Sequence, residues 1–528
     1  MILQHKFNRD LVIMAIVSTI RINHYQDSMK LMEISQKLSV LEGVKQASAI
    51  MATEANLLML KEAGLIEKIP ESAVANDLIV AVEAKSVEIG NEAIDKLDSL
   101  LAPADFDSSS SVIYKSLETA SSALPGANVA VVSVPGEYAK LEVAKAIEKG
   151  LHTFLFSDNL SIEEEVELKE RATEKGLLVM GPGCGTAIIN GIGLGFSNII
   201  NSGPIGVIAA AGTGLQEVTS LINNLGSGIT HGIGVGGRDL SEQVGGITTL
   251  QAIKMLNNDQ ATEVFLLVSK PPSKKVAEKI LTAVKKTGKP AVICFLGSLL
   301  KNEDPNISFI STLEDASIRA VQLAEKSNKK PGINFSKYWD KYAQQAVKSL
   351  DSEQKYLRGL YSGGTLCYEA QQVLQPILGN IYSNAPLNKE FKLKDSNKSK
   401  RNSLIDLGEE EFTVGRPHPM IDANLRSERI MSEATKTDVG VILFDVILGY
   451  VASPDPAGDL LPAIKEAKKS AKKKGRNLVF VSHVCGTDKD PQGLIEQEEK
   501  LREQGVLVFP TNALASTVAG MIIARGDI

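Results

Sequence analysis

Short apolar runs alternate with amphipathic stretches along most of the chain. Residues 128–134 form a nearly continuous apolar run, typical of a strand buried on both faces of a parallel sheet. A stretch with helical spacing follows at 138–149, and the alternation continues with strands at 153–157 and 177–180 around a helix at 162–175. This pattern predicts a doubly wound α/β sheet, in which ligands bind at the carboxyl ends of the strands.

The same alternation divides the chain into several α/β domains. We predict an N-terminal extension at 1–17, a small α/β domain at 18–102, a Rossmann-like domain at 112–202, and flavodoxin-like domains at 203–328 and 356–528. A serine-rich stretch before residue 112 has the composition of a flexible joint. Because the last two domains follow the same plan, they are candidate paralogous halves.

Two glycine-rich turns each follow an apolar strand and open a helix. The first spans 211–214 and the second 362–365, and each combines glycines with a threonine. Free N–H groups at a helix start carry partial positive charge, and glycines let an anion approach the backbone. An ordinary turn explains either stretch alone, but together they predict a shared phosphate or carboxylate site. The candidate anion-binding residues are Gly212, Thr213, Gly214, Gly363, Gly364 and Thr365.

The composition limits the classes of molecule that the chain is expected to bind and the compartment in which it is expected to lie. A net charge of −6 over 528 residues offers no extended basic surface for a nucleic acid. Four cysteines without a Cys-x-x-Cys pair predict no disulfide framework and no metal site, which suits a reducing cytoplasm. The longest apolar run, 11–20, is well below the ~20 residues that span a bilayer. We therefore expect a cytoplasmic protein with no membrane segment.

Several motifs in their order along the chain resemble those of succinyl-CoA synthetase. The stretch 181–185, Gly-Pro-Gly-Cys-Gly, followed by 205–217 is similar to that enzyme's α subunit, and the region from Gly359 onward resembles the ligase domain of its β subunit. This arrangement resembles that of the FdrA family of acyl-CoA synthetase-like proteins, in which both regions lie in one chain with no ATP-grasp module between them. The motif at 413–422, with Arg416 and His418 between prolines, also resembles this family.

The resemblance implies roles for particular residues. In the synthetase, two helix starts cradle the phosphate of a phosphohistidine, and they match the two glycine-rich turns here. The phosphohistidine is expected after the strand that ends at Phe295, yet the chain has no histidine between His231 and His418. The cradle is therefore expected to hold a free phosphate or an acyl phosphate. For a CoA-like cofactor, the candidate contacts at the strand ends are Pro135, Asn159, Gly181 and Cys184.

Other polar residues each have a structural alternative. His418 could transfer a proton and Arg416 could bind an anion, although both could belong to a purely structural loop. Arg238 and Lys270 follow strands and could neutralise an anionic substrate, but an exposed turn explains Lys270 equally well. Cys184 fits a small buried thiol better than a nucleophile.

The leading functional hypothesis rests on the FdrA resemblance. It implies acyl or carbamoyl transfer with phosphate, as in oxamate carbamoyltransfer during ureide breakdown, by a homo-oligomer acting with partner enzyme subunits. Two alternatives stay open: an acyl-CoA synthetase like succinate–CoA ligase, and a non-catalytic scaffold that binds a small anion. No cofactor is certain, CoA is possible, and the substrate cannot be named from the sequence.

Overall fold

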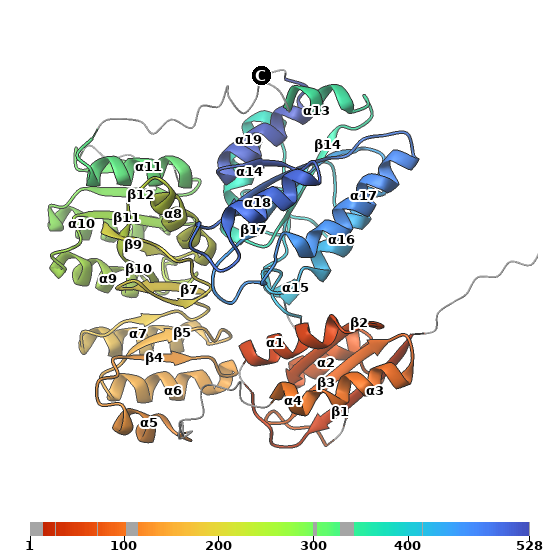
Figure 1. Ribbon diagram of the computed structural model, residues 1–528. Coiled ribbons are helices and arrows are strands. Elements are labelled where there is room, and N and C mark those ends of the chain that lie inside the picture. Colours follow the sequence, from red (N-terminus) through yellow and green to blue (C-terminus); the bar gives the residue numbers. More distant parts are fainter. Residues whose placement is uncertain are drawn as a thin grey trace, which may run out of the picture. The chain divides into compact units, whose positions relative to one another are not determined.

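The computed structural model describes residues 14–26, 28–70, 72–101, 114–298, 304–327, 343–413 and 416–526. Its contacts divide the chain into two compact units (Figure 1). The first comprises residues 1–113 together with 410–417, and the second comprises 114–409 together with 418–528. The further division of the second unit into domains stays a prediction.

The first unit is built on a three-stranded antiparallel sheet with the order β1-β3-β2. The sheet already includes Ala15, ahead of the predicted domain start at 18, because Ala15 pairs with Ala84. Apolar side chains of the sheet pack with those of the helices into two buried clusters. The elements are β1 (Ala15–Arg21), α1 (Ser28–Ser39), β2 (Val44–Met51), α2 (Glu54–Glu62), β3 (Leu78–Ala84), α3 (Val87–Asp95), α4 (Leu97–Leu101) and, from the later segment, α15 (Glu410–Thr413).

The second unit opens with a small parallel sheet of order β4-β5-β6. Its strands are short and its helices are longer, and the helix α7 starts with a complete capping box formed by Ser161 and Glu164. The elements are α5 (Leu117–Ala123), β4 (Val129–Val132), α6 (Gly136–Glu148), β5 (His152–Leu155), α7 (Ile162–Glu174) and β6 (Val179–Met180).

A seven-stranded sheet follows, with the order β13-β12-β11-β9-β10-β7-β8. Its five parallel strands have the flavodoxin order, and an antiparallel hairpin, β7 and β8, extends one edge. The hairpin precedes residue 203, so the sheet begins before the predicted domain boundary. The elements are β7 (Thr186–Ile189), β8 (Ile192–Gly195), β9 (Ser202–Ala209), α8 (Gly212–Asn224), β10 (Ile229–Gly234), α9 (Ile247–Asn258), β11 (Val264–Ser269), α10 (Lys274–Thr287), β12 (Ala291–Phe295), β13 (Ile307–Phe309) and α11 (Leu313–Ala324).

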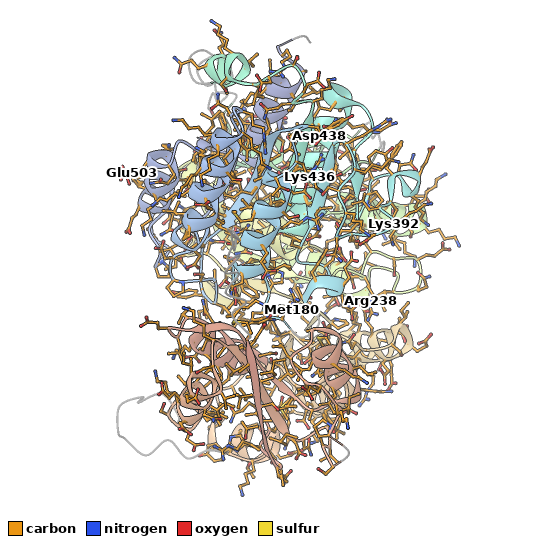
Figure 2. All side chains as sticks on the ribbon, turned by 90° about the vertical axis from the view of Figure 1, so that its right-hand side faces the viewer. Met180, Arg238, Lys392, Lys436, Asp438 and Glu503 are labelled. Carbon is orange, nitrogen blue, oxygen red and sulfur yellow. The ribbon has the colours of Figure 1, made fainter. Side chains whose placement is uncertain are left out.

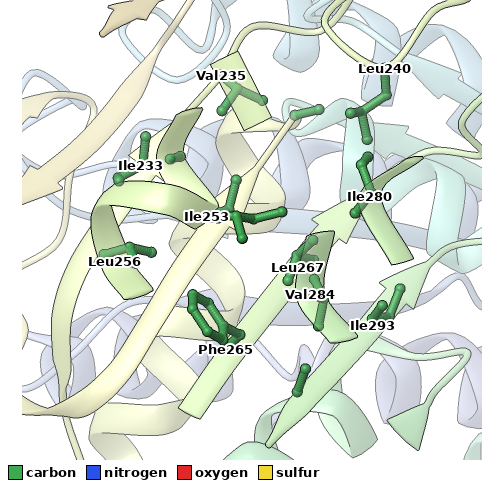
Figure 3. Close-up of a cluster of buried hydrophobic side chains, with 14 of the residues drawn as sticks. Ile233, Val235, Leu240, Ile253, Leu256, Phe265, Leu267, Ile280, Val284 and Ile293 are labelled. Atoms are coloured by element: carbon green, nitrogen blue, oxygen red, sulfur yellow. The ribbon is translucent and has the colours of Figure 1, made fainter. Parts of the chain in front are cut away.

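One face of this sheet packs against α9 and α10 and forms a large apolar core (Figure 3). Phe265 and Leu267 of β11 meet Ile253 of α9 and Ile280 of α10 in this core. The strands are apolar on both faces because helices cover both sides, as the continuous apolar runs predict.

The last sheet is fully parallel, with the order β15-β16-β14-β17-β18-β19. Without the two-residue strand β15, it repeats the flavodoxin order of the preceding sheet. The elements are α13 (Gln344–Ser349), β14 (Tyr356–Tyr361), α14 (Gly364–Leu378), β15 (Tyr382–Ser383), η2 (Lys389–Phe391), β16 (Ser403–Asp406), α16 (Asn424–Ala434), β17 (Val439–Ile447), η3 (Gly458–Leu460), α17 (Leu461–Lys473), β18 (Val479–Cys485), α18 (Leu494–Glu503), β19 (Leu507–Phe509) and α19 (Asn512–Ile523).

The two flavodoxin-like halves pack through one layer of helices. Helices α8 and α11 of the first half contact α14 and α19 of the second half (Figure 1). The predicted fold class, several α/β domains with parallel sheets, is confirmed. The first helix of each half, α8 or α14, begins directly after a central strand, so both helix starts face the same layer.

Candidate functional site

The structure brings the two glycine-rich helix starts into contact. The backbone N–H of Thr365, in the first turn of α14, donates to Oγ1 of Thr213, in the first turn of α8, at 3.3 Å. The N-cap residues, Ala211 of α8 and Gly363 of α14, provide no side-chain cap for their own helices. Two partial positive charges therefore meet in one place, as the repeated motif predicts.

Glycine is needed at this junction because the helices approach closely. A Cβ atom added to Gly214 would lie 2.9 Å from Cγ2 of Thr365, and one added to Gly363 would lie 3.1 Å from Cβ of Thr213. A Cβ at Gly364 would overlap the carboxylate of Asp406. These glycines thus have a packing role, whatever ligand the junction binds.

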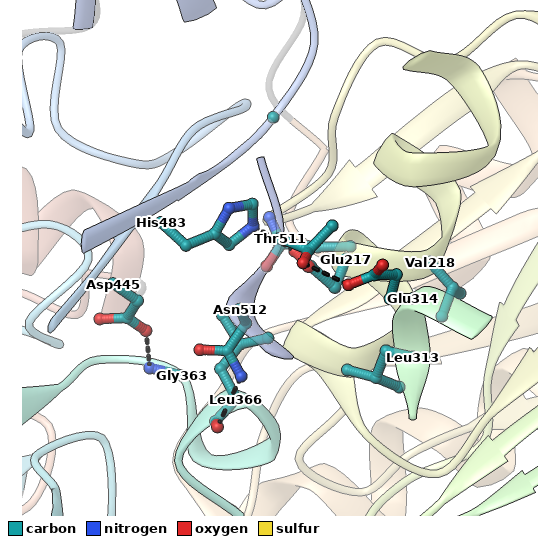
Figure 4. A network of polar contacts seen from close by, with 12 residues as sticks. Glu217, Val218, Leu313, Glu314, Gly363, Leu366, Asp445, His483, Thr511 and Asn512 are labelled. Carbon is teal, nitrogen blue, oxygen red and sulfur yellow. Dashed lines mark hydrogen bonds and ion pairs between the residues drawn. The ribbon is translucent and has the colours of Figure 1, made fainter. Parts of the chain in front are cut away.

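The start of α14 already holds a carboxylate of the protein itself. Asp445, in the buried strand β17, accepts hydrogen bonds from the N–H groups of Ser362 and Gly363 at 2.8 and 2.7 Å (Figure 4). Arg426 of α16 neutralises this carboxylate through an ion pair of 2.8 Å. The N–H groups at the start of α8 are therefore the better candidates for an external anion.

A second carboxyl group, Asp406 at the end of β16, lies beside Gly364. Burial, helped by the charge of Glu409 and opposed by that of Lys270, raises the pKa of Asp406 to about 7. Its Oδ1 accepts a hydrogen bond from the N–H of Gly408 at 3.0 Å. Asp406 can therefore gain or lose a proton near neutral pH next to the helix start.

The structure places His418 in the same neighbourhood. Its ring packs against Phe196 at 5.8 Å between ring centres, and its Nε2 lies close to Gly408. Burial and the charge of Arg426 lower the pKa of His418 to about 4, so the ring is neutral at pH 7. Nδ1 accepts from the N–H of Met420 at 3.2 Å, which assigns the ring hydrogen to Nε2. At neutral pH His418 is thus suited to donating a hydrogen bond from Nε2.

The three predicted cations have different surroundings. Nζ of Lys270 lies 3.8 Å from Glu409 and 5.8 Å from the ring centre of Tyr368 in α14, which places Lys270 near the junction. Arg238, which is labelled in Figure 2, instead donates to Glu165 at 3.0 Å and to the carbonyl of Leu160 at 2.9 Å. Its charge is therefore already paired within the protein. Arg416 falls in the segment 410–417, which belongs to the first unit. Their roles in anion binding stay predictions.

The predicted cofactor contacts lie at the carboxyl edge of the small sheet. Gly136, next to Pro135, packs against the backbone of Asp158 and Asn159, and Gly181 packs against Leu155. Cys184 is buried, donates to the carbonyl of Thr186 at 3.4 Å, and has its pKa raised to about 12 by burial. A neutral thiol of this kind is not a nucleophile at pH 7. Cofactor binding at this edge stays a prediction.

Sequence reasoning gave no role to Arg426 or Asp445. Asp445 is the only charged residue in the apolar strand β17, and an acid in such a strand signals a buried partner. Arg426 shares a helix face with the buried residues Ile430 and Ala434, at spacings of four and eight. These two sequence patterns could have indicated a buried ion pair, but neither pattern shows which residue is the partner of Asp445 or of Arg426.

Comparison with known proteins defines the family. The chain is 39% identical to "Uncharacterized protein YahF" of Escherichia coli strain K12 over 518 residues, which cover 97% of this chain and all of that protein. The chain belongs to the YahF family. The family model described as CoA binding domain matches residues 201–297, which include α8, and the CoA-ligase model matches residues 360–522, which include α14. The CoA-binding match thus lies on the seven-stranded sheet.

More distant relatives match only part of the YahF-like chain. The α subunit of ADP-forming succinate–CoA ligase from Methanothermobacter thermautotrophicus is 24% identical over 30% of this chain. Subunit SqwL of an ADP-forming sulfoacetate–CoA ligase from an Acholeplasma species is 25% identical over 31% of this chain. The matches span 53% and 56% of these two relatives, about half of their length.

Two solved structures resemble this chain, both with low TM-scores. A dinucleotide-forming acetyl-coenzyme A synthetase of Ca. Korarchaeum cryptofilum has a TM-score of 0.31 at 16% identity, covering 76% of this chain and 82% of that chain. ATP citrate lyase from Methanothrix soehngenii has a TM-score of 0.35 at 13% identity, covering 78% and 84%.

A third family model, described as AllF, heavy metal-associated domain, matches residues 14–114. This segment contains no cysteine and a single histidine, His24, so its residues do not fit a thiolate site for a soft metal. Within the described part of the chain, no group of three metal-ligating side chains is found. The described helices also include none that is long and apolar enough to cross a bilayer.

Proposed function

We propose that this chain is an acyl-CoA ligase-like enzyme component that binds a phosphate or an acyl phosphate at the joined starts of α8 and α14. The observation that carries the proposal is the hydrogen bond from Thr365 to Thr213. It joins a helix within the CoA-binding match to a helix within the CoA-ligase match. Relatives that match about a third of this chain are subunits of succinate–CoA and sulfoacetate–CoA ligases, which supports ligase-like chemistry here.

The chemistry at this junction follows from charge. An anion at the start of α8 is stabilised by free N–H groups in a site that already excludes much water. Asp406, with its pKa near 7, exchanges a proton beside the ligand, and His418 donates from Nε2. Lys270 adds a positive charge from the end of β11.

The phosphate is not carried on a histidine in this proposal. No histidine occurs between His231 and His418, and His418 is neutral and holds the N–H of Met420 through Nδ1. A free acyl phosphate therefore passes its acyl group to the thiol of CoA at the junction and releases inorganic phosphate. We assign the nucleotide chemistry to a partner subunit, because the ADP-forming relative is itself one subunit of its enzyme.

A second candidate is acyl or carbamoyl transfer with phosphate, the activity that membership of the FdrA family implies. The missing phosphohistidine favours it, because transfer from a free acyl phosphate needs no phosphoenzyme. A calorimetric titration with CoA separates the two: a ligase-like component binds CoA, whereas a carbamoyltransferase component binds carbamoyl phosphate and not CoA. A chain that binds phosphate but shows no turnover with its partners is the scaffold of the third hypothesis.

The site itself is tested with Thr213→Val, which keeps the shape of the side chain and removes its oxygen. We expect inorganic phosphate to bind about tenfold more weakly, because the junction loses one hydrogen bond and the N–H of Thr365 loses its acceptor. Titration calorimetry measures the change. Thr219→Val is the matched control, since Thr219 lies further along α8 and bonds only to backbone carbonyls of its own helix. Equal phosphate affinity in both variants would contradict the proposal.

A further inference from the structure

Lys270 lies between the two helix starts of the junction. It follows β11, and Val268, two residues before it, packs against the first turn of α8, where a Cβ added to Gly214 would lie 3.2 Å from Cγ1 of Val268. From the other half, the ring of Tyr368 in α14 has its centre 5.8 Å from Nζ of Lys270. The long, flexible side chain of Lys270 can therefore reach an anion that binds where α8 and α14 meet.

The structure pairs Lys270 with Glu409. Nζ of Lys270 lies 3.8 Å from Oε1 of Glu409, and the two side chains are 43% and 42% exposed. An ion pair that is this long and this exposed contributes little stability, so Lys270 can leave Glu409 for a more strongly held anion. A phosphate dianion at the junction is such an anion, because backbone N–H groups hold it as well.

Asp406 lies beside the same junction, against the first turn of α14. A Cβ added to Gly364 would overlap the carboxylate of Asp406. The two residues that flank Gly364 both face Thr213 of α8: a Cβ added to Gly363 would lie 3.1 Å from Cβ of Thr213, and the N–H of Thr365 donates to its hydroxyl. A negative charge bound where the helices meet therefore repels ionised Asp406 across a largely buried space, where water screens it poorly.

Other charged and titratable groups face Asp406 from the elements packed around it. They are Lys270 after β11, Glu409 after β16, Asp445 of β17, Cys367 of α14, and His418 beside Gly408. Burial lowers the pKa of His418 to about 4 and raises that of the Cys367 thiol well above its usual range, so both are neutral at pH 7. Asp445 is held by Arg426. The half-exposed pair of Lys270 and Glu409 is thus the arrangement that a bound anion can change.

We propose that Lys270 passes from Glu409 to the bound anion, and that this exchange places a proton from solvent on Asp406. The anion and the Glu409 carboxylate, once Lys270 has left it, both make the surroundings of Asp406 more negative. The junction therefore binds a phosphate group together with a proton. This inference rests on the proposed function and adds how its anion site responds to pH.

The exchange predicts the direction in which anion affinity depends on pH. Asp406 has a pKa of about 7 before the anion binds, and the bound anion raises that pKa further. Between the two pKa values binding takes up a proton, so the affinity falls as pH rises above about 7, by at most about tenfold per pH unit. Asp406→Asn has no proton to lose, so at pH 8.5 it should bind the anion about tenfold more tightly than the parent chain.

The probe for this linkage is sulfate, a tetrahedral dianion whose charge stays constant between pH 6 and pH 8.5, whereas inorganic phosphate titrates within that range. Calorimetric titrations of the full chain in two buffers of different ionisation enthalpy give the number of protons taken up per sulfate. At pH 8 we expect about half a proton or more in the parent chain and none in Asp406→Asn. Thermal unfolding at pH 6 shows that each variant is folded.

Two half-exposed positions test the exchange without changing the buried acid. Glu409→Gln removes the competitor for Lys270, so sulfate should bind about threefold to tenfold more tightly with a smaller proton uptake. Lys270→Gln should weaken sulfate binding about tenfold. The matched controls are Glu242→Gln and Lys275→Gln, which remove the members of another exposed ion pair of the same half, at 2.5 Å, and should change neither affinity nor proton uptake.

Sulfate binding without proton uptake would overturn the inference, and so would equal sulfate affinities in Glu409→Gln and Glu242→Gln. Both results leave the anion site of the proposed function intact. No sulfate binding by the parent chain would overturn the site and the exchange together. Thr213→Val separates the two ideas, because it should weaken sulfate binding while the proton uptake per bound sulfate stays the same.

Discussion

Asp406 of β16 and Asp445 of β17 both lie beside the start of α14, but they have different partners. Asp445 faces Arg426 and two backbone N–H groups, which all stabilise its ionised form. Asp406 is 3% exposed and accepts from the backbone of Gly408. The sheet therefore presents one carboxyl group that is ion-paired with Arg426 and one that titrates near pH 7.

The shifted pKa of Asp406 predicts a pH-dependent stability. Because its pKa is raised from 3.8 to about 7 in the folded chain, the native state holds a proton that the unfolded chain loses, and stability falls as pH rises from about 4 to about 7. Asp406→Asn should remove this loss, so it should raise the Tm at pH 8 but not at pH 4. Calorimetric scans at both pH values measure the difference. The exposed Asp488→Asn should show no such difference, and a variant that is less stable at pH 8 would contradict the assignment.

Among the secondary-structure elements, the helix starts make polar contacts that join the two flavodoxin-like halves. Glu369, on the second turn of α14, accepts from the N–H of Leu313 at 2.6 Å and from Asn512 at 2.8 Å. It thereby contacts the starts of both α11 and α19. Thr511, before α19, donates to Glu314 of α11 at 2.5 Å (Figure 4). The helix layer is thus held by polar contacts at the ends of its helices as well as by packing.

Two glycines of α8 give a matched test of how closely the helices pack. A Cβ at Gly214 would lie 2.9 Å from Thr365, whereas one at Gly212 would meet only Oγ1 of Thr186 at an ordinary 3.6 Å. Gly214→Ala should therefore destabilise the second unit by about 1–3 kcal/mol. Gly212→Ala should be neutral or stabilise it by about 0.4–1 kcal/mol, because alanine restricts the unfolded chain. Urea unfolding measures both, and equal effects would show that the junction is looser than described.

Sequence patterns predicted these elements well where burial dictates the pattern. The apolar strands and the two glycine-rich helix starts follow from local rules, so they were found. The hairpin β7–β8 was missed, although Asn190 and Gly191, both with positive φ, are a typical two-residue hairpin turn. The repeated motif predicted that the helix starts with Thr213 and Thr365 lie together. The pair Arg426–Asp445 could not be predicted, because no local pattern specifies which distant side chain fills a given position.

At the scale of the whole second unit, one buried ion pair connects the halves. Nε2 of His483, in β18, lies 2.8 Å from Glu217, in α8, and both side chains are at most 3% exposed. Burial lowers the pKa of His483, but the charge and hydrogen bond of Glu217 outweigh it, so the net pKa is raised. Glu217 and Glu369 occupy the same position, the sixth residue, of the corresponding helices α8 and α14, yet they have different partners.

The Glu217–His483 pair predicts a second effect of pH on stability, this time through a base that is charged at low pH rather than an acid. A raised histidine pKa contributes stability at low pH that is lost as pH rises through the folded pKa. Glu217→Gln leaves a buried histidine without its counter-ion and should cost about 3–5 kcal/mol near pH 5.5. The cost should shrink toward pH 9, as His483 loses its proton. Tm values at both pH values measure it, with the exposed Glu325→Gln as control, and a cost independent of pH would contradict the charged pair.

The Glu217–His483 pair also has a consequence for synthesis. Glu217 leaves the ribosome 266 residues before His483, so the first half is translated with an acid whose partner does not yet exist. A buried carboxylate without a counter-ion is unfavourable, and the helix layer of the first half has no second half to cover it. During synthesis Glu217 therefore lies on an uncovered face of α8, and its ion pair can form only once β18, which carries His483, has been made.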